Sequence, residues 1–169
     1  MHLMPSPTPE IILENIKEWI NNLGKLSITP HKNPKCHFSI WVSLPESSII
    51  QPIMVTYPKN DEKILFGWHW LMETMDSKAY HAITDISKKL HLTNSFRNEA
   101  MKRKFILQFE PDIFKLKGIA IFKFIPINEL TKESFRGVML DLMYMWGYLM
   151  SLFEKNDMSR AGFNPSDYI

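Results

Sequence analysis

Glycine and cysteine are scarce in this sequence of 169 residues, and neither forms a functional pattern. The six glycines are scattered, so the chain has neither a P-loop nor a dinucleotide-binding fingerprint, since both need clustered glycines beside a phosphate. A nucleophile elbow and a zinc-protease helix motif are also missing. The sequence therefore gives no positive sign of an enzyme, and we expect no bound cofactor.

Cys36 is the only cysteine, so the chain cannot form an internal disulfide. A chain of this kind is typical of a reducing compartment, which predicts a cytoplasmic protein. His31 and His37 lie close to Cys36 in sequence, and thiolate and imidazole groups can bind zinc when they converge. Cys36 and His37 are adjacent, however, and would point to opposite faces of a strand. We therefore predict no metal site.

Strong charge of either sign is also absent, because the net charge is only +2. Basic residues concentrate between positions 85 and 109, which carry six basic and two acidic groups. Lys102, Arg103 and Lys104 are our candidate contacts for phosphate in this segment. A dedicated nucleic-acid binder usually has a larger excess, so a solvated helix face is the favoured interpretation. Association with nucleic acid through this segment is therefore the alternative function, not the leading one.

The longest apolar stretch, residues 137–153, falls just short of the about 20 residues that span a bilayer. Asp141 lies inside it, and a carboxylate costs about 2.5–3.5 kcal/mol at the centre of a membrane helix. We therefore expect a buried amphipathic helix and no membrane association. We expect Asp141 to face a polar edge or to pair with a base such as Arg136 or Lys123.

Hydrophobic periodicity predicts an α+β fold. Apolar residues at helical spacing follow Thr8-Pro9-Glu10, and alternating residues predict strands over 37–44, 53–57, 64–72, 105–109 and 117–126. A helical pattern from Tyr80 to Leu90 is interrupted at Thr93–Ser95 and resumes, and a long helix runs from Thr131 to about Lys155. The expected domain is a five-stranded, mostly antiparallel sheet with an N-terminal helix, one or two middle helices and a long C-terminal helix packed on it. It spans residues 1–155 in the order α-βββ-α-ββ-α, and residues 156–169 form a tail.

Large apolar residues are abundant, with eleven methionines, eleven phenylalanines and five tryptophans. Most belong in a core, but such residues also suit a surface that grips a partner. The apolar face of the last helix is wider than one sheet needs, so a second element or a second subunit should cover the rest. The candidate partner-binding residues are Trp68, Trp70, Met143, Trp146 and Met150.

Three segments resemble an uncharacterised, mainly archaeal domain-of-unknown-function family with a type III secretion chaperone-like fold. They are Cys36–Val42, the turn at Tyr57–Asn60, and the junction from Ile125 to Phe135, followed by the apolar helix with Leu142 and Trp146. The resemblance covers about residues 9–155 and carries over no catalytic residues. It implies a small dimer that binds extended partner segments on apolar surface. Together with the missing catalytic motifs, this predicts a non-enzymatic protein-binding module, a homodimer with a protein partner of unknown identity. A small-molecule enzyme without a recognisable motif is the third alternative.

Overall fold

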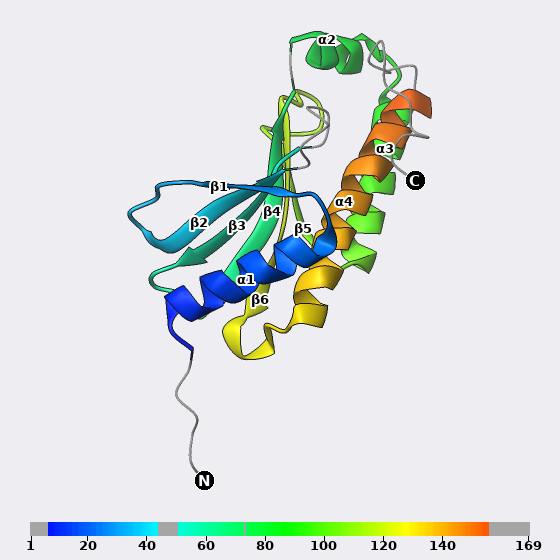
Figure 1. The fold of residues 1–169 in the computed structure, drawn as a ribbon. Coiled ribbons are helices and arrows are strands. Elements are labelled where there is room, and N and C mark those ends of the chain that lie inside the picture. Colours follow the sequence, from blue (N-terminus) through cyan, green and yellow to red (C-terminus); the bar gives the residue numbers. More distant parts are fainter. Residues whose placement is uncertain (1–6, 44–50, 73, 156–169) are drawn as a thin grey trace. The chain divides into compact units, whose positions relative to one another are not determined.

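The computed structural model describes residues 7–43, 51–72 and 74–155 and confirms the α+β class. Its strands form one six-stranded sheet in the order β1-β2-β3-β4-β6-β5 (Figure 1). The predicted tail, residues 156–169, lies outside the described residues. The elements are α1 (Pro9–Leu23), β1 (Ser27–Pro30), β2 (Cys36–Ser43), β3 (Ile53–Pro58), β4 (Lys63–Leu71), α2 (Thr74–Ala82), α3 (Ile86–Lys102), β5 (Ile106–Glu110), β6 (Gly118–Pro126), the 3₁₀ turn η1 (Ile127–Glu129) and α4 (Lys132–Lys155).

The count of five strands was one short, because β1 was not predicted. This strand has four residues, and its apolar Ile28 stands alone between Ser27 and Thr29, so no alternation marks it. It forms because β2 offers an edge: Ser27 pairs opposite Ser43 and Pro30 opposite Ile40. Tertiary pairing thus makes a strand where local sequence gives no signal.

The chain divides into two compact units. The first unit contains Met1–Gly67 and Lys123–Leu140, and the second contains Trp68–Phe122 and Asp141–Ile169. Each boundary falls inside β4, β6 or α4, so these three elements contribute residues to both units.

The core of the first unit lies between α1 and the antiparallel strands β1 to β3. Ile12, Ile16 and Ile20 recur at steps of four on α1 and are buried, which is the stripe that the sequence predicts. In the strands, Ser39 and Thr56 are also buried, and their hydroxyl oxygens lie 2.9 Å apart in a hydrogen bond. This bond lets two polar side chains remain in the core without an unmet partner.

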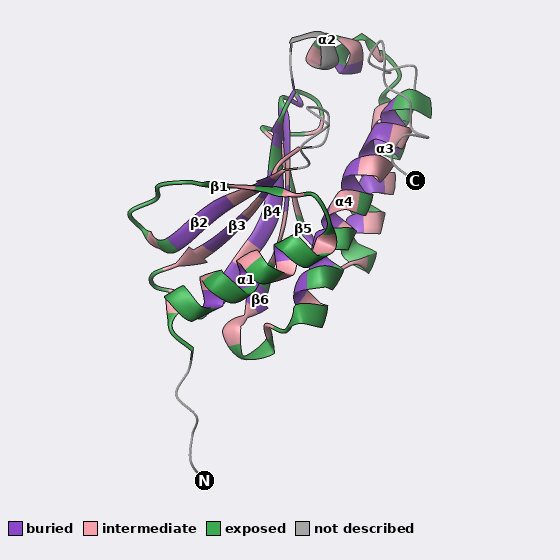
Figure 2. Cartoon of the chain, in the orientation of Figure 1, coloured by how far each residue is buried: buried purple, intermediate pink, exposed green. Residues whose placement is uncertain are grey.

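The core of the second unit contains α3 and the C-terminal part of α4, which lie side by side (Figure 1). The two helices touch where Phe96 stacks on Tyr148, with ring centroids 6.5 Å apart. Buried residues line both helices and β6, whose Ile119 and Ile121 are fully buried (Figure 2). In this unit α3 is the second element that the wide apolar face of α4 was expected to need.

The break between the middle helices was predicted in the wrong place. The chain leaves helical geometry around Thr84, whereas α3 continues through Thr93–Ser95. Thr93 stays helical because its Oγ1 donates to the carbonyl of Lys89 at 2.9 Å, which satisfies the buried hydroxyl. The helix begins at Asp85, whose carboxylate accepts a hydrogen bond from Ser87 N at 2.8 Å.

The long helix α4 begins at the predicted cap, Thr131. Thr131 Oγ1 accepts from Ser134 N at 3.1 Å, while Ser134 Oγ accepts from Thr131 N at 2.8 Å. This reciprocal pair is a capping box with serine in the place of the usual glutamate. No helix in the described part of the chain is both long and apolar enough to cross a membrane.

Candidate functional site

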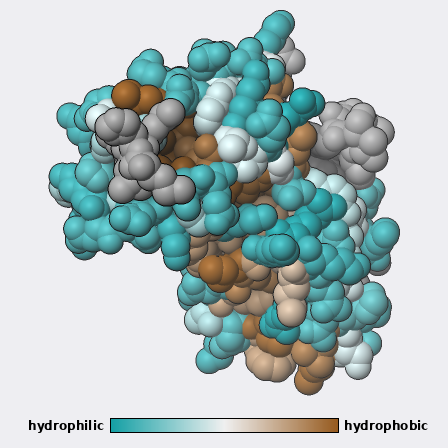
Figure 3. Space-filling model, turned by 90° about the horizontal axis from the view of Figure 1, so that it is seen from below, coloured by the Kyte–Doolittle hydropathy of each residue, from teal (hydrophilic) through white to brown (hydrophobic). Residues whose placement is uncertain are grey.

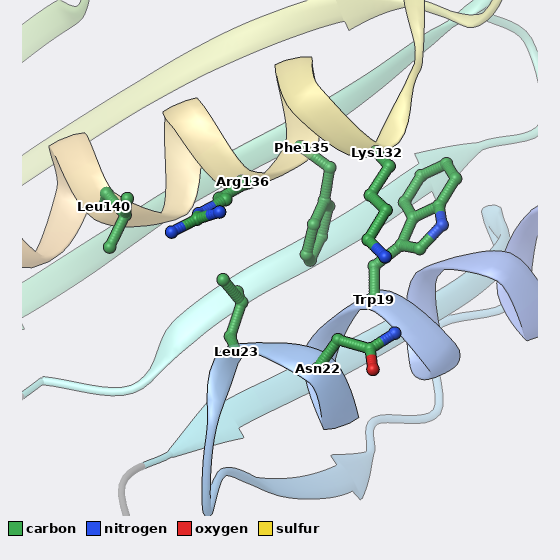
Figure 4. Close-up of a pocket in the computed structure, with 7 residues that line it drawn as sticks. All are labelled: Trp19, Asn22, Leu23, Lys132, Phe135, Arg136 and Leu140. Atoms are coloured by element: carbon green, nitrogen blue, oxygen red, sulfur yellow. The ribbon is translucent and has the colours of Figure 1, made fainter.

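A pocket of about 370 Å³ opens in the first unit between the last turns of α1 and the first turns of α4. This volume is near the lower end of the about 300–1,000 Å³ range of ligand pockets. In Figure 4, Phe135 points from α4 toward α1, and Leu23 points from α1 toward α4. The lining residues are Trp19, Asn22, Leu23, Lys132, Phe135, Arg136 and Leu140.

Aromatic packing fixes the floor of this pocket. Phe135 is fully buried and lies between Trp19 and Phe66, with ring centroids 5.6 Å and 5.9 Å from its own. Because Phe66 belongs to the buried face of β4, these contacts tie the pocket floor to the core of the first unit. Trp19 is partly exposed and therefore presents apolar surface to the pocket. The floor is thus rigid and apolar.

Polar groups lie on the rim. Asn22, Lys132 and Arg136 are exposed, and in Figure 4 the Lys132 side chain runs toward Trp19. Lys132 and Arg136 are four residues apart, so they are neighbours on one face of α4. Within the described residues, neither makes an ion pair. Both charges are therefore available to a ligand.

The three tryptophans among the predicted partner-binding residues lie in the core of the second unit. Trp68, Trp70 and Trp146 are 2%, 4% and 3% exposed, and Met150 is also buried. Trp146 meets both other rings edge-on at 5.4 Å, and Trp68 Nε1 donates to the carbonyl of Leu142 at 3.2 Å. These residues pack the domain, and a partner could reach them only if this core opened.

Met143, the fifth predicted partner-binding residue, is partly exposed. Hydrophobic residues that reach the surface occur elsewhere as well, among hydrophilic ones (Figure 3). They include Leu71 on β4, Ile106 on β5, and Leu140 and Tyr144 on α4. Of these, Leu140 belongs to the pocket described above.

The predicted phosphate contacts have different surroundings. Arg103 donates to Glu99 Oε1 at 3.1 Å and to Asp141 Oδ1, and it lies over the ring of Tyr144. Burial lowers the pKa of Arg103, but the hydrogen bonds to Asp141 and Glu99 outweigh it and raise the pKa above its usual range. Lys102 also pairs with Glu99, at 3.5 Å, whereas Lys104 is exposed.

Asp141 therefore pairs with a base, as predicted, and that base is Arg103 of α3. The bases suggested by the sequence lie nearer to Asp141 along the chain. Arg103 is 38 residues from Asp141, and the two become neighbours only because α3 packs beside α4. The Arg103–Asp141 pair joins these two helices, and both side chains are about 30% exposed. It functions as a structural contact within the second unit.

A histidine and a glutamate meet on the second unit's sheet. His69 Nε2 lies 2.9 Å from Glu110 Oε2, and both side chains are partly exposed. Gly118 packs closely against this part of the sheet: a Cβ there would lie 3.3 Å from Glu110 Oε2 and 3.2 Å from the carbonyl oxygen of Trp70.

The residues considered for zinc have separate aromatic neighbours. His31 lies edge-on to Trp41, while the His37 ring lies 4.6 Å from Tyr57. Across residues 7–43, 51–72 and 74–155, no group of three or more His, Cys, Asp or Glu side chains could hold a metal ion.

The pocket residues were not predicted as a site. Trp19 was predicted only as an apolar position of the first helix, Arg136 was expected as a possible partner of Asp141, and Lys132 was given no role in a site. A usable signal was present, since two basic residues flank Phe135 at one-turn spacing on an otherwise amphipathic helix. What sequence could not show is that α1 lies opposite, because 112 residues separate Asn22 from Phe135 and no local pattern links them.

Comparisons with known proteins relate the chain to others by fold. No protein family matches its sequence, and no curated protein matches it. A crystal structure of an uncharacterized protein from Methanothermobacter thermautotrophicus, an archaeon, superposes with a TM-score of 0.70. That alignment covers 84% of this chain and 96% of the other, at 17% identity.

A second solved structure is that of YbjN from E. coli, a proposed transcription regulator. It aligns with a TM-score of 0.44 and 15% identity over 86% of this chain and 91% of that one, a likeness too weak to support an inference. The chain therefore shares its fold with an uncharacterised archaeal protein.

Proposed function

We propose that this protein is a non-enzymatic, cytoplasmic binding module that holds a segment of a partner polypeptide. The pocket between α1 and α4 is the observation that supports this proposal. Its rigid apolar floor can take a large side chain, and its open rim leaves room for the rest of a peptide to lie across α1 and α4. Among the described residues that line it there is no serine, threonine, cysteine, histidine or carboxylate, and the titratable ones are Lys132 and Arg136.

The resemblance to the archaeal family with a secretion chaperone-like fold is consistent with such a role. The fold shared with the Methanothermobacter protein supports kinship with an uncharacterised archaeal family, though a shared fold is weak support for function. A homodimer belongs to the same proposal. Light scattering across protein concentration tests it, and a strict monomer at high concentration would remove the dimer from the proposal.

Selection of random peptides displayed on phage against the immobilised chain tests the binding function. We expect the selected peptides to converge on a pattern that contains a large apolar residue. Leu140→Gln should weaken their binding about threefold to tenfold, because the substitution removes apolar surface from the pocket.

Leu71→Gln is the matched control, since Leu71 is an exposed leucine of β4 that does not line the pocket. Its binding should equal that of the unaltered chain. If the peptides fail to converge, or if both variants bind equally well, the pocket is not a peptide site.

A further inference from the structure

The rim of the pocket has one sign of charge. Lys132 and Arg136 are the titratable residues that line it, and within the described residues neither is neutralised by an ion pair. Two exposed cations side by side repel each other and gain from an anion placed between them. The charge on the rim thus selects for an acidic occupant.

The positions of these cations also favour a carboxylate next to an apolar group. On α4 they flank Phe135, and residues four apart on a helix have their Cβ atoms about 5–6 Å apart. Both side chains are long and exposed, so their charged ends can turn toward one carboxylate, to which the planar guanidinium of Arg136 can donate two parallel hydrogen bonds. An apolar side chain attached nearby would then reach Trp19, Leu23 and Leu140, with the Asn22 amide as a further hydrogen-bonding group.

We propose that the pocket binds an acidic-apolar polypeptide segment, in which a Glu or Asp carboxylate contacts Lys132 and Arg136 while an adjacent aromatic or branched side chain enters the pocket. This inference rests on the proposed function and adds the chemistry of the partner. The basic pair sets specificity, and the accessible surfaces of Trp19, Leu23 and Leu140 supply the apolar contact area.

A nucleic acid is the other polyanion that two cations and a tryptophan could attract. An extended nucleic-acid backbone needs a continuous basic track, and the outer face of α1 beside the pocket is acidic instead. It presents exposed Glu10, Glu14 and Glu18 at steps of four. A short acidic segment of a polypeptide avoids this repulsion, because its charge can be confined to the pocket rim.

Fluorescence anisotropy with matched labelled peptides tests the proposal. The probe is Gly-Glu-Phe-Glu-Leu-Gly, with both ends blocked, beside a version in which glutamine replaces each glutamate. We expect the acidic peptide to bind about threefold to thirtyfold more tightly, and the difference to shrink as salt is raised.

Lys132→Gln with Arg136→Gln should remove that preference, so that the acidic and glutamine peptides bind this variant equally well. Both residues are exposed, so the variant should fold, and circular dichroism verifies it. The control variant, Lys59→Gln with Lys63→Gln, makes the same change in net charge at exposed lysines of the first unit outside the pocket. It should keep the preference. Lys132→Glu with Arg136→Glu should favour a lysine-containing version of the peptide instead.

The outcomes separate the two proposals. Equal binding of the acidic and glutamine peptides, both weakened by Leu140→Gln, would overturn the acidic specificity and leave the peptide site standing. No binding of any peptide in this experiment or of displayed peptides would overturn both. Tighter binding of a single-stranded oligonucleotide than of the acidic peptide, sensitive to Lys132 and Arg136, would assign the pocket to nucleic acid.

Discussion

At the scale of single residues, Lys104 shows how a backbone position can matter more than a charge. It has a φ of 60°, and it follows α3 in a Schellman motif in which Lys104 N donates to the carbonyl of Met101. Phe105 N completes the motif by donating to the carbonyl of Ala100 at 2.9 Å. The left-handed region costs a lysine energy that glycine does not incur.

We therefore predict that Lys104→Gly stabilises the protein by about 0.5–1 kcal/mol. Lys102→Gly is the matched control, because residue 102 is still helical and glycine there should cost about 1 kcal/mol. Urea unfolding of both variants measures the difference. A destabilised Lys104→Gly variant would mean that its side chain makes a contact that outweighs the backbone gain.

Tyr80 makes the free energy of unfolding depend on pH. Its side chain is buried, its hydroxyl donates to the carbonyl of Ile113 at 2.6 Å, and burial raises the pKa of Tyr80 to about 12, with the charge of Asp112 adding to the rise. The unfolded chain releases this proton near pH 10. The contribution of Tyr80 to stability is therefore complete below pH 10 and is lost as the pH rises toward 12.

Tyr80→Phe should cost about 0.5–1.5 kcal/mol at pH 8, because the hydrogen bond to Ile113 is removed. The difference between the two proteins should then narrow between pH 10 and 12. Free energies of unfolding of the unaltered protein and of Tyr80→Phe, measured between pH 8 and 12, test this prediction. A difference that stays constant to pH 12 would show that the pKa of Tyr80 is not raised.

At the scale of elements, the contact between α3 and α4 includes the ion pair of Arg103 and Asp141, which lies beside the ring of Tyr144. Arg103 bonds Asp141 and Glu99 and covers the ring of Tyr144. This pair is about two-thirds buried, so it should contribute more than a surface pair yet less than a fully buried one.

A double-mutant cycle with Arg103→Met and Asp141→Asn should give a coupling energy of about 1–2 kcal/mol. The cycle of Lys17→Met and Glu14→Gln on α1 is the comparison, and it should give at most about 0.5 kcal/mol because that pair is more exposed. Equal coupling in the two cycles would contradict a special role for Arg103 in joining the helices.

At the scale of the whole molecule, the two units are connected without linkers. The chain passes from one to the other within β4, within β6 and within α4. Unfolding either unit would break hydrogen bonds of elements that continue into the other. We therefore predict a single cooperative unfolding transition.

Core truncation in each unit tests this prediction. Ile16→Ala in the first unit and Leu92→Ala in the second each remove a fully buried side chain and should cost about 2–5 kcal/mol. For each variant, tryptophan fluorescence and far-ultraviolet circular dichroism should give the same unfolding midpoint, shifted from that of the unaltered protein. Two separate transitions, each sensitive to one substitution, would show that the units unfold independently.

Sequence alone determined the features that repeat with a local period. The isoleucine stripe of α1, the alternation in β2 and β4 and the Thr131 cap of α4 each follow from neighbouring residues, so the α+β class could be predicted. Steric and hydrogen-bonding preferences over a few residues are enough to produce them. Residues whose structure depends on distant partners were predicted less well: β1 needs the edge of β2, and the continuity of α3 needs the burial of Thr93.

Only the tertiary structure decided which apolar and charged residues are available for function. The sequence offers three tryptophans that would suit a partner-binding surface, but in the structure Trp146 packs against both Trp68 and Trp70. Arg103 is neutralised by Asp141, whereas Lys132 and Arg136 remain unpaired within the described residues beside Trp19 and Phe135. A pocket forms where surfaces distant in sequence fail to fill the space between them, and local periodicity contains no information about that space.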